Sequence, residues 1–446
     1  MSMGEGVRIT REENEILTMV GPGTPMGNLF RRYQIPVLLS AELEPGGQPK
    51  RVRLLGEDLV AFRSQSGKVG LVGESCAHRC ASLYFGRIEP EGIRCVYHGW
   101  KYGLDGQCLE MPNVFPEHQF KEKVHLPAYP CVERGGFIWT YMGPSKEPPP
   151  VPDFEFLMVP AENCYIEQRD YQNCNYLQAL DGGIDPSHGA FLHGPIQSRS
   201  VVDDEALQGH GTGIGADRNV GGTMRVGFAT GQRTPVVEMA ETEYGVAVAG
   251  RRNTGEEKYL WRINHFLMPF YTIPPWMPEK SCLCHMWVPV DDEHCINWRP
   301  RWHPFRPLTE DERQVFAYEH LPPTPEAYGD IRLSANRSNN YFMNWEIHRT
   351  RKFGIPTLHL EDVAITESQG PICDRTKQNL THADMASLAV YRRLLNAAKA
   401  LRDFGTLPAE LPDPTIYQRI RGGCVDLAKE ESWVEQTKRQ RMEVAS

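Results

Sequence analysis

Two cysteines and two histidines lie within a stretch of 23 residues and are the side chains best suited to chemistry. They form the pairs Cys76-Ala-His78 and Cys95-Val-Tyr-His98, with sixteen residues between the pairs. Two loops that each carry one thiolate and one imidazole can hold a metal centre between them. This spacing predicts a [2Fe–2S] cluster, with Cys76 and Cys95 on one iron and His78 and His98 on the other.

A structural zinc site is the main alternative for these four ligands. Zinc sites of the Cys₂His₂ type usually keep the two cysteines together and the two histidines together, whereas each pair here holds one of each. A chance cluster is a second alternative, because the chain has 12 cysteines and 15 histidines. The neighbouring Arg79 and the run His98-Gly99-Trp100 complete the pattern of Rieske-type clusters, which favours the iron–sulfur interpretation.

A second pair of possible ligands, His188 and His193, follows about a hundred residues later, with Asp185 three residues before the first of them. Two histidines five residues apart on a bent helix can converge on one metal ion. A distant carboxylate then completes a 2-His-1-carboxylate triad for non-haem Fe(II), which leaves positions open for O₂. Ordinary core or surface histidines would also explain the spacing, but its place after the cluster motif favours iron. Composition leaves four candidates for the carboxylate: Glu361, Asp362, Glu367 and Asp374.

The composition indicates a globular protein of two domains, because 446 residues exceed one ordinary core. A formal net charge of −9 argues against nucleic-acid binding, which requires a basic surface. The sequence has no apolar run long enough for a membrane helix and no apolar signal-peptide core. Twelve irregularly spaced cysteines do not resemble a disulfide framework, so we expect a cytoplasmic protein with reduced thiols.

The elements expected before residue 150 are short strands, with the four cluster ligands on the loops between them. The strands are expected at 37–39, 50–54, 59–62, 69–72, 103–110, 124–129 and 136–141. The proline run 148–150 is typical of a linker. The chain is therefore divided into an N-terminal segment (1–28), an iron–sulfur domain (29–150), a catalytic domain (151–405) and a C-terminal tail over the surface (406–446).

The elements expected after residue 150 mix helix and strand. A helix over 170–193, bent or interrupted at Pro186, would carry the two histidines. A strand-rich stretch over 224–288 and an amphipathic helix over 383–404 follow. The glycine-rich segment 211–215 lacks the preceding strand and following helix of a dinucleotide-binding turn. We therefore expect electrons to come from another protein.

The chain resembles the oxygenase α subunits of Rieske non-haem iron aromatic-ring hydroxylases, most of all the phthalate dioxygenase-like branch. The matching segments are 29–36, 51–63, 76–100, 175–193, 269–271 and 361–384. The resemblance implies an α+β fold, with an N-terminal all-β Rieske domain followed by a larger helix-grip-like catalytic domain with a central antiparallel sheet. It also implies one [2Fe–2S] cluster and one mononuclear Fe(II), without bound nicotinamide or flavin.

The resemblance assigns roles to several residues. The position matching Asp362 is the family's iron carboxylate, which leaves Glu361 a structural role. The aspartate matching Asp185 bridges a Rieske histidine and an iron-ligand histidine across a subunit boundary. This implies electron entry from a neighbouring chain, and hence a homotrimer or a stacked hexamer. Cys80 stands where the family generally has glycine.

The activity implied by the resemblance is that of a terminal oxygenase that hydroxylates an aromatic carboxylate of the phthalate, isophthalate or benzoate type. Cis-dihydroxylation is the leading expectation, with electrons from a separate NAD(P)H-dependent reductase of the flavin or ferredoxin type. A monooxygenase, such as an O- or N-demethylase, is the close alternative. A pure electron carrier is disfavoured, because it would need only about one domain.

An anionic ring requires a fixed cation in the substrate pocket. Arginine suits a carboxylate because its planar guanidinium donates two parallel hydrogen bonds. Arg251 and Arg252, at the end of the strand expected over 245–250, are candidates, as is Arg262 on the next strand. The place of Arg251 directly after the strand makes it the preferred one.

Overall fold

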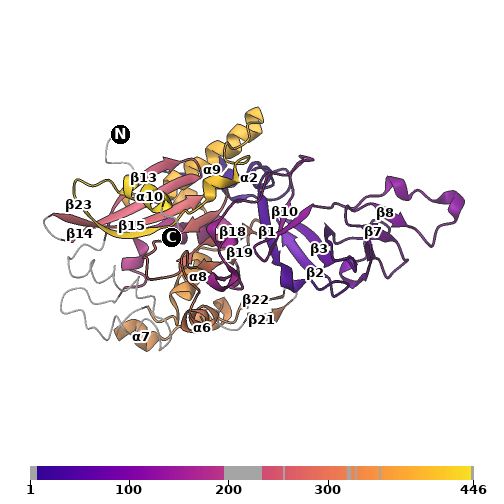
Figure 1. The fold of residues 1–446 in the computed structure, drawn as a ribbon, viewed down its shortest axis with the longest axis horizontal. Coiled ribbons are helices and arrows are strands. Elements are labelled where there is room, and N and C mark those ends of the chain that lie inside the picture. Colours follow the sequence, from indigo (N-terminus) through magenta and orange to yellow (C-terminus); the bar gives the residue numbers. More distant parts are fainter. Residues whose placement is uncertain are drawn as a thin grey trace.

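The computed structural model describes residues 8–194, 234–254, 257–318, 323–326, 329–350 and 353–442. The molecule is elongated, with a narrow all-β end around β7 and β8 and a wider half that contains both helices and a large sheet (Figure 1). The predicted α+β fold, an all-β domain followed by a larger domain on a mainly antiparallel sheet, is confirmed. None of the helices described here has the length and apolar character needed to span a bilayer.

The all-β end consists of three small antiparallel sheets. The first joins β1 (Gln34–Leu39), β10 (Phe137–Tyr141) and β9 (Cys131–Arg134). The second joins β2 (Lys50–Leu54), β3 (Glu57–Arg63) and β4 (Val69–Gly73). The third joins β5 (Arg87–Glu89), β6 (Gly92–Arg94), β7 (Lys101–Gly103) and β8 (Cys108–Glu110). The first pair of cluster ligands therefore follows β4, and the second lies between β6 and β7.

A large sheet forms the centre of the second half. Its strands lie in the order β13 (Val236–Thr242), β14 (Gly245–Asn253), β15 (Lys258–Leu267), β16 (Tyr271–Ile273), β18 (His285–Pro289), β19 (Cys295–Trp298), β12 (Arg169–Gln172), β22 (Gly329–Leu333) and β21 (Pro323–Glu326). β23 (Gly423–Ala428) also pairs with β15. The pairs are antiparallel except for β12 with β22. A smaller sheet joins β11 (Cys164–Tyr165), β20 (Arg301–Trp302) and β17 (Cys282–Leu283).

Helices cover both faces of the central sheet. The helices are α1 (Arg11–Thr18), α2 (Pro25–Phe30), α3 (Tyr176–Ile184), α6 (Glu310–Tyr318), α7 (Trp345–Thr350), α8 (Leu358–Ser368), α9 (Met385–Phe404) and α10 (Trp433–Met442). α3 contacts β15, β16 and β18, and α9 contacts β13 and β14. On the opposite face Trp433 of α10 packs against Trp261 of β15, with ring centroids 6.0 Å apart. Helix α9 begins after a capping box of Thr381 and Asp384 and ends at Gly405, whose φ is +66°.

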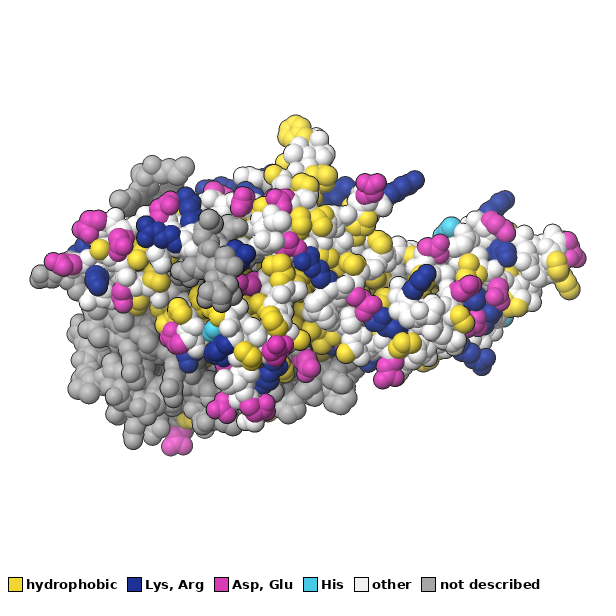
Figure 2. All heavy atoms as spheres, in the orientation of Figure 1, with side chains coloured by type: hydrophobic (Ala, Val, Ile, Leu, Met, Phe, Trp, Pro, Cys, Tyr) yellow, Lys and Arg dark blue, Asp and Glu magenta, His cyan; other side chains and the backbone are white. Residues whose placement is uncertain are grey.

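One hydrophobic core runs through both halves of the molecule. Phe30 of α2 contacts the rings of Tyr176 and Phe270 edge-on, at centroid distances of 5.1 and 5.2 Å. Arg169 of β12 also forms a two-point ion pair with Glu42 of the first domain, with both N–O distances at 2.5 Å. Acidic and basic side chains are intermixed over the described surface shown in Figure 2. The two domains are therefore joined by packing and by charge.

The structure corrects three local expectations. Residues 170–193 do not form one helix: β12 comes first, α3 starts only at the N-cap Asn175, and a separate 3₁₀ turn covers His188–Ala190. Pairing with β19 makes 169–172 a strand, because sheet contacts override local helix preference. The expected strand 103–110 is broken by a turn at Gly106, where φ is +82°. Residues 124–129 contribute only isolated bridges.

The segment 406–446 is not the surface tail that we expected. Its strand β23 pairs with β15 from Lys258 to Ile263, so this segment is part of the catalytic sheet. Its many charged residues suggested a tail, but Glu410 and Arg421 are buried, at 4% and 2% exposure. The domain boundaries near residues 28 and 150 stay predictions. Residues 211–215, and residues 224–233 of the expected strand-rich stretch, lie outside the described residues.

Candidate metal centres

The two cluster loops form one compact site. Cys76 and Cys95 are buried, at 1% and 2% exposure. The rings of His78 and His98 lie 4.5 Å apart between centroids, and His78 stacks on Trp100 at 4.6 Å. The structure thus brings together all four ligands that the sequence predicted at this site. Two come from the loop after β4, and two come from the loop between β6 and β7.

The loops also suit an iron–sulfur cluster chemically. The pKa of Cys95 is raised by burial and by the neighbouring Cys76, as expected for two thiols close together in an apolar site. A buried metal would relieve this cost, because thiolate is the form that binds metal. Nδ1 of His78 is buried and has no hydrogen-bond partner among the described residues, which leaves its lone pair available as a ligand. Tyr102 places its hydroxyl 3.1 Å from the Cys76 sulfur and can tune it.

The two loops share a backbone pattern in which Cys80 and Gly99 are equivalent. Cys80 N donates to Cys76 O at 2.8 Å, and Gly99 N donates to Cys95 O at 3.0 Å. Both residues have positive φ, +56° for Cys80 and +78° for Gly99. A non-glycine residue pays a conformational penalty in this region. Cys80 therefore occupies a position that its backbone geometry makes suitable for glycine.

We expect Cys80→Gly to stabilise the first domain by about 1 kcal/mol, since it removes the left-handed penalty. The measurement is the thermal midpoint of cluster bleaching in the visible spectrum. Cys80→Ser is the matched control, because it removes the thiol but keeps a side chain at positive φ. An equal gain in the serine variant would show that the thiol, and not the backbone, is responsible.

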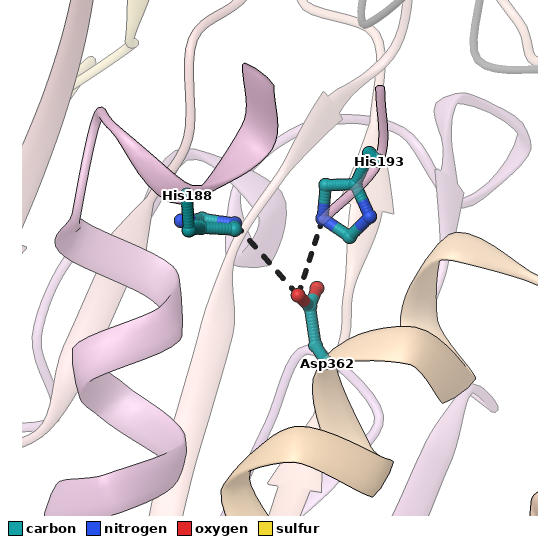
Figure 3. Close-up of side chains that lie close together, drawn as sticks. All are labelled: His188, His193 and Asp362. Carbon is teal, nitrogen blue, oxygen red and sulfur yellow. Dashed lines mark ion pairs between the residues drawn. The ribbon is translucent and has the colours of Figure 1, made fainter. Parts of the chain in front are cut away.

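The second centre brings His188, His193 and Asp362 together, although Asp362 lies far along the chain. Their ligand atoms all lie within 4.8 Å of one another. The Asp362 carboxylate is 3.2 Å from Nε2 of His193 and 3.7 Å from Nε2 of His188. Figure 3 shows the two imidazoles above the carboxylate, with the histidines on the chain after α3 and Asp362 on α8. Of the four carboxylates left open by composition, Asp362 is the one that faces both histidines.

Local structure explains how each ligand is placed. Asp185 ends α3, and its carboxylate accepts hydrogen bonds from the backbone N–H groups of Ser187 and His188, at 2.8 and 3.0 Å. This tight turn directs His188 back towards α8. Nδ1 of His188 lies 3.0 Å from the Asp185 carbonyl oxygen and 3.5 Å from its carboxylate. Nε2 of His188 is therefore the nitrogen left to face a metal.

The electric field at the triad favours a cation. Although burial alone would lower the pKa of His193, the carboxylates of Asp362 and Glu361 raise it to about 10. Burial alone would raise the pKa of Asp362, but His193 and His188 hold it below its usual value. Two imidazoles and one carboxylate with an open side form the donor set of a non-haem Fe(II) site. These residues therefore fit the metal that the sequence predicted.

The three candidate arginines lie on β14 and β15, but not on one face. Arg251 points to the α10 side, where its Nε is 3.1 Å from Glu238 and its guanidinium lies over Tyr259. Arg252 points to the α3 side, is 3% exposed, and places Nη2 3.4 Å from the Pro186 carbonyl oxygen. Arg262 is aligned with Gly250, two residues from Arg252 on the same face. Arg252 and Arg262, rather than Arg251, therefore face the loop with the histidines.

Comparison with known proteins identifies the family. Residues 34–130 match the Rieske [2Fe-2S] domain, and residues 140–441 match the family described as LigXa C-terminal domain like. The oxygenase subunit of 3-chlorobenzoate-3,4-dioxygenase from Comamonas testosteroni is 35% identical over 95% of this chain and 96% of its own. The chain belongs to the Rieske non-haem iron oxygenases. It is an oxygenase α subunit of the phthalate dioxygenase-like branch, and hence an oxidoreductase.

Two further relatives show the range of this family. The oxygenase subunit of phthalate 4,5-dioxygenase from Pseudomonas putida is 32% identical over 95% of this chain and 94% of its own. That of 5,5'-dehydrodivanillate O-demethylase from Sphingobium sp. (strain NBRC 103272 / SYK-6) is 29% identical over 92% and 86%. The family's cofactors are the Rieske [2Fe–2S] cluster and a mononuclear iron. The predicted cofactors of this Rieske oxygenase are thereby confirmed.

Sequence reasoning missed several contacts of these centres. It gave Glu361 only a structural role, whereas the Glu361 carboxylate lies 2.6 Å from Nδ1 of His193. It also gave no role to Trp100 beyond the motif, and could not show that Arg252 contacts the loop of His188. The position of Glu361 next to Asp362 could have suggested a contact with the metal site. Only the folded structure shows that its carboxylate contacts Nδ1 of His193.

Proposed function

We propose that this Rieske oxygenase is the terminal component of a system that hydroxylates an aromatic carboxylate of the phthalate, isophthalate or benzoate type. Electrons come from a separate NAD(P)H-dependent reductase of the flavin or ferredoxin type. The observation that carries the substrate class is the buried Arg252 against Pro186, two residues before His188. The names of the chlorobenzoate and phthalate relatives support the same class.

We assign the metal ligands as follows. Cys76, His78, Cys95 and His98 hold the cluster, and His188, His193 and Asp362 hold the mononuclear iron. When bound, these metals supply one electron at a time and a place for O₂ activation beside the substrate. The protein's part is to orient His188 through Asp185 and to hold the ring near the open side of the triad.

Arg252 has the properties of an anion anchor. Burial, together with the positive charge of Arg262, lowers the pKa of Arg252 to about 10, so the guanidinium remains charged at neutral pH. Two like charges on one buried face favour the arrival of an anion between them. A carboxylate held there in a two-point contact would fix the rest of the ring relative to the triad.

Replacing Arg252 with alanine should raise KM for the aromatic acid by about 10- to 100-fold, the worth of a hydrogen-bonded charge pair of 1.5–3 kcal/mol. The measurement is steady-state turnover with a series of benzoates and phthalates. Arg251→Ala is the comparison, because Arg251 pairs with Glu238 on the other face. A larger effect in the Arg251 variant than in the Arg252 variant would reverse the assignment.

Electron entry from a neighbouring chain fits the shape of the molecule. The cluster loops adjoin β7 in the narrow end, whereas α8 with Asp362 lies in the wide half (Figure 1). Val96 and Tyr97 beside the cluster are 52% and 55% exposed, and Phe191 beside the triad is 56% exposed. We infer a homotrimer or stacked hexamer, in which Asp185 links the cluster of one chain to the iron of the next. Sedimentation of the holoenzyme as a monomer would contradict this arrangement.

Cis-dihydroxylation is the leading reaction, and monooxygenation at the same iron is the second candidate, favoured by the O-demethylase relative. A product screen with ¹⁸O₂ and aromatic acids, using a generic reductase, distinguishes the two. Two labelled oxygens in one dihydrodiol indicate a dioxygenase, and one labelled oxygen in an alcohol or released aldehyde indicates a monooxygenase. Turnover of neutral aromatics in preference to acids would contradict the proposed substrate class.

A further inference from the structure

Glu361 is a buried carboxylate whose contact has no role in the function described so far. Glu361 is 1% exposed and His193 is 5% exposed. Oε2 of Glu361 lies 2.6 Å from Nδ1 of His193. A buried carboxylate is costly unless it is paired. We infer that Glu361 is a positioning residue for the mononuclear iron site, one that acts on the metal through His193. This inference rests on the proposed assignment of His193 as an iron ligand.

Two neighbouring carboxylates of α8 contact the two ring nitrogens of His193. Glu361 and Asp362 are neighbours on α8, so their side chains leave the helix about 100° apart. His193 lies between them, with Nδ1 at Glu361 and Nε2 3.2 Å from Asp362. Glu361 accepts a hydrogen bond from the Nδ1–H group and so favours the tautomer in which Nε2 carries the lone pair. A carboxylate in this place also makes the imidazole a stronger donor to a metal.

The two histidines of the triad are held unequally. Nδ1 of His188 faces a peptide oxygen at 3.0 Å and the Asp185 carboxylate only at 3.5 Å, and its side chain is 27% exposed. The His193 side chain is 6% exposed and faces the Glu361 carboxylate directly. His193 is therefore the more buried of the two histidines and the one with the shorter contact between Nδ1 and a carboxylate. Glu361 should govern how tightly iron is held, whereas Asp185 should govern how electrons reach it.

A second buried glutamate on the same helix provides a matched control. Glu367, 8% exposed, accepts from the Tyr341 hydroxyl at 2.6 Å and from the Asn173 backbone N–H at 2.8 Å. Among the described residues, the hydrogen-bond partners of its carboxylate are Asn173 and Tyr341, and neither belongs to the triad. Glu361→Gln and Glu367→Gln therefore each remove one buried charge from α8 with no change in size. Only the first alters the partner of His193.

The experiment measures Fe(II) affinity in the full chain with its cluster in place. The mononuclear iron is removed with a chelator and returned as Fe(II) against a competing chelator, and the nitrosyl complex of Fe(II) is followed by electron paramagnetic resonance. We expect Glu361→Gln to weaken Fe(II) binding about 10-fold and Glu361→Ala about 100-fold, with a shifted nitrosyl signal. Glu367→Gln should retain wild-type affinity, and the visible cluster spectrum should be unchanged in all variants.

Each other outcome has a definite meaning. Wild-type affinity in Glu361→Gln and Glu361→Ala would overturn the inference, and so would equal losses in the Glu361 and Glu367 variants, which would indicate a general effect on α8. His193→Ala separates this inference from the proposed function. If His193→Ala kept its iron, the ligand assignment itself would be wrong; if it lost iron while the Glu361 variants did not, only the role of Glu361 would fail.

Discussion

Asp362→Ala is expected to abolish hydroxylation while the Rieske cluster stays intact. The substitution removes the only charged ligand that we assign to the mononuclear iron and leaves two histidines, of which His193 still pairs with Glu361. Loss of the metal removes several kcal/mol of catalytic assistance, so product formation should fall below about one-thousandth of the wild-type rate. The checks are product yield, iron per chain and the visible spectrum of the cluster.

Asp374→Ala is the control for this prediction. Asp374 was one of the four carboxylates left open by composition, but it is exposed and caps the short turn Arg375–Lys377. Its removal should leave the iron content unchanged. Iron of about three atoms per chain in the Asp362 variant, against two for the cluster alone, would contradict the ligand assignment.

Asp185→Asn should have the second largest effect, with both metals retained. The amide preserves the shape of the turn but replaces an acceptor oxygen by a donor that faces the N–H groups of Ser187 and His188. The loss of the negative charge beside His188, and of the link to the neighbouring chain, should lower coupled turnover by about 100-fold. The measurement is reoxidation of the pre-reduced cluster in a single turnover, together with product formed per O₂ consumed.

Ser187→Ala is the matched control for Asp185→Asn. It removes the hydroxyl that donates to the Asp185 carboxylate at 2.8 Å but keeps the carboxylate itself. We therefore expect a much smaller effect on turnover. Normal cluster reoxidation in the Asp185 variant would rule out a role for this residue between the two centres.

The two metal centres could be predicted from the chain alone, because metal ligation restricts residue type and spacing. The fold class followed from the resemblance that these motifs carry. Cys76, His78, Cys95 and His98 lie close in sequence, so two loops of fixed length suffice to bring them together. His188 and His193 are also local, because five residues on a tight turn keep both rings on one side. Such short-range geometry is encoded in the spacing itself.

The positions that the sequence left open depend on long-range packing. The carboxylate partner of the histidines comes from α8, more than a hundred residues later, and only the packing of α8 against α3 shows that Asp362 faces both rings. Arg251 and Arg252 are neighbours, and the choice between them depends on which face of β14 meets α3. A shift of one residue in strand register exchanges the two faces.

The same reasoning explains the C-terminal segment. Gly423–Ala428 has weak local signals, and its pairing with β15 is a contact between residues far apart in sequence. Spacing within a loop is set by covalent geometry, so composition and order were enough to predict the chemistry of the two metal centres. Side-chain direction on a helix or strand is set by what the element packs against, so the anchor for the substrate and the partner of His193 became visible only in the folded chain.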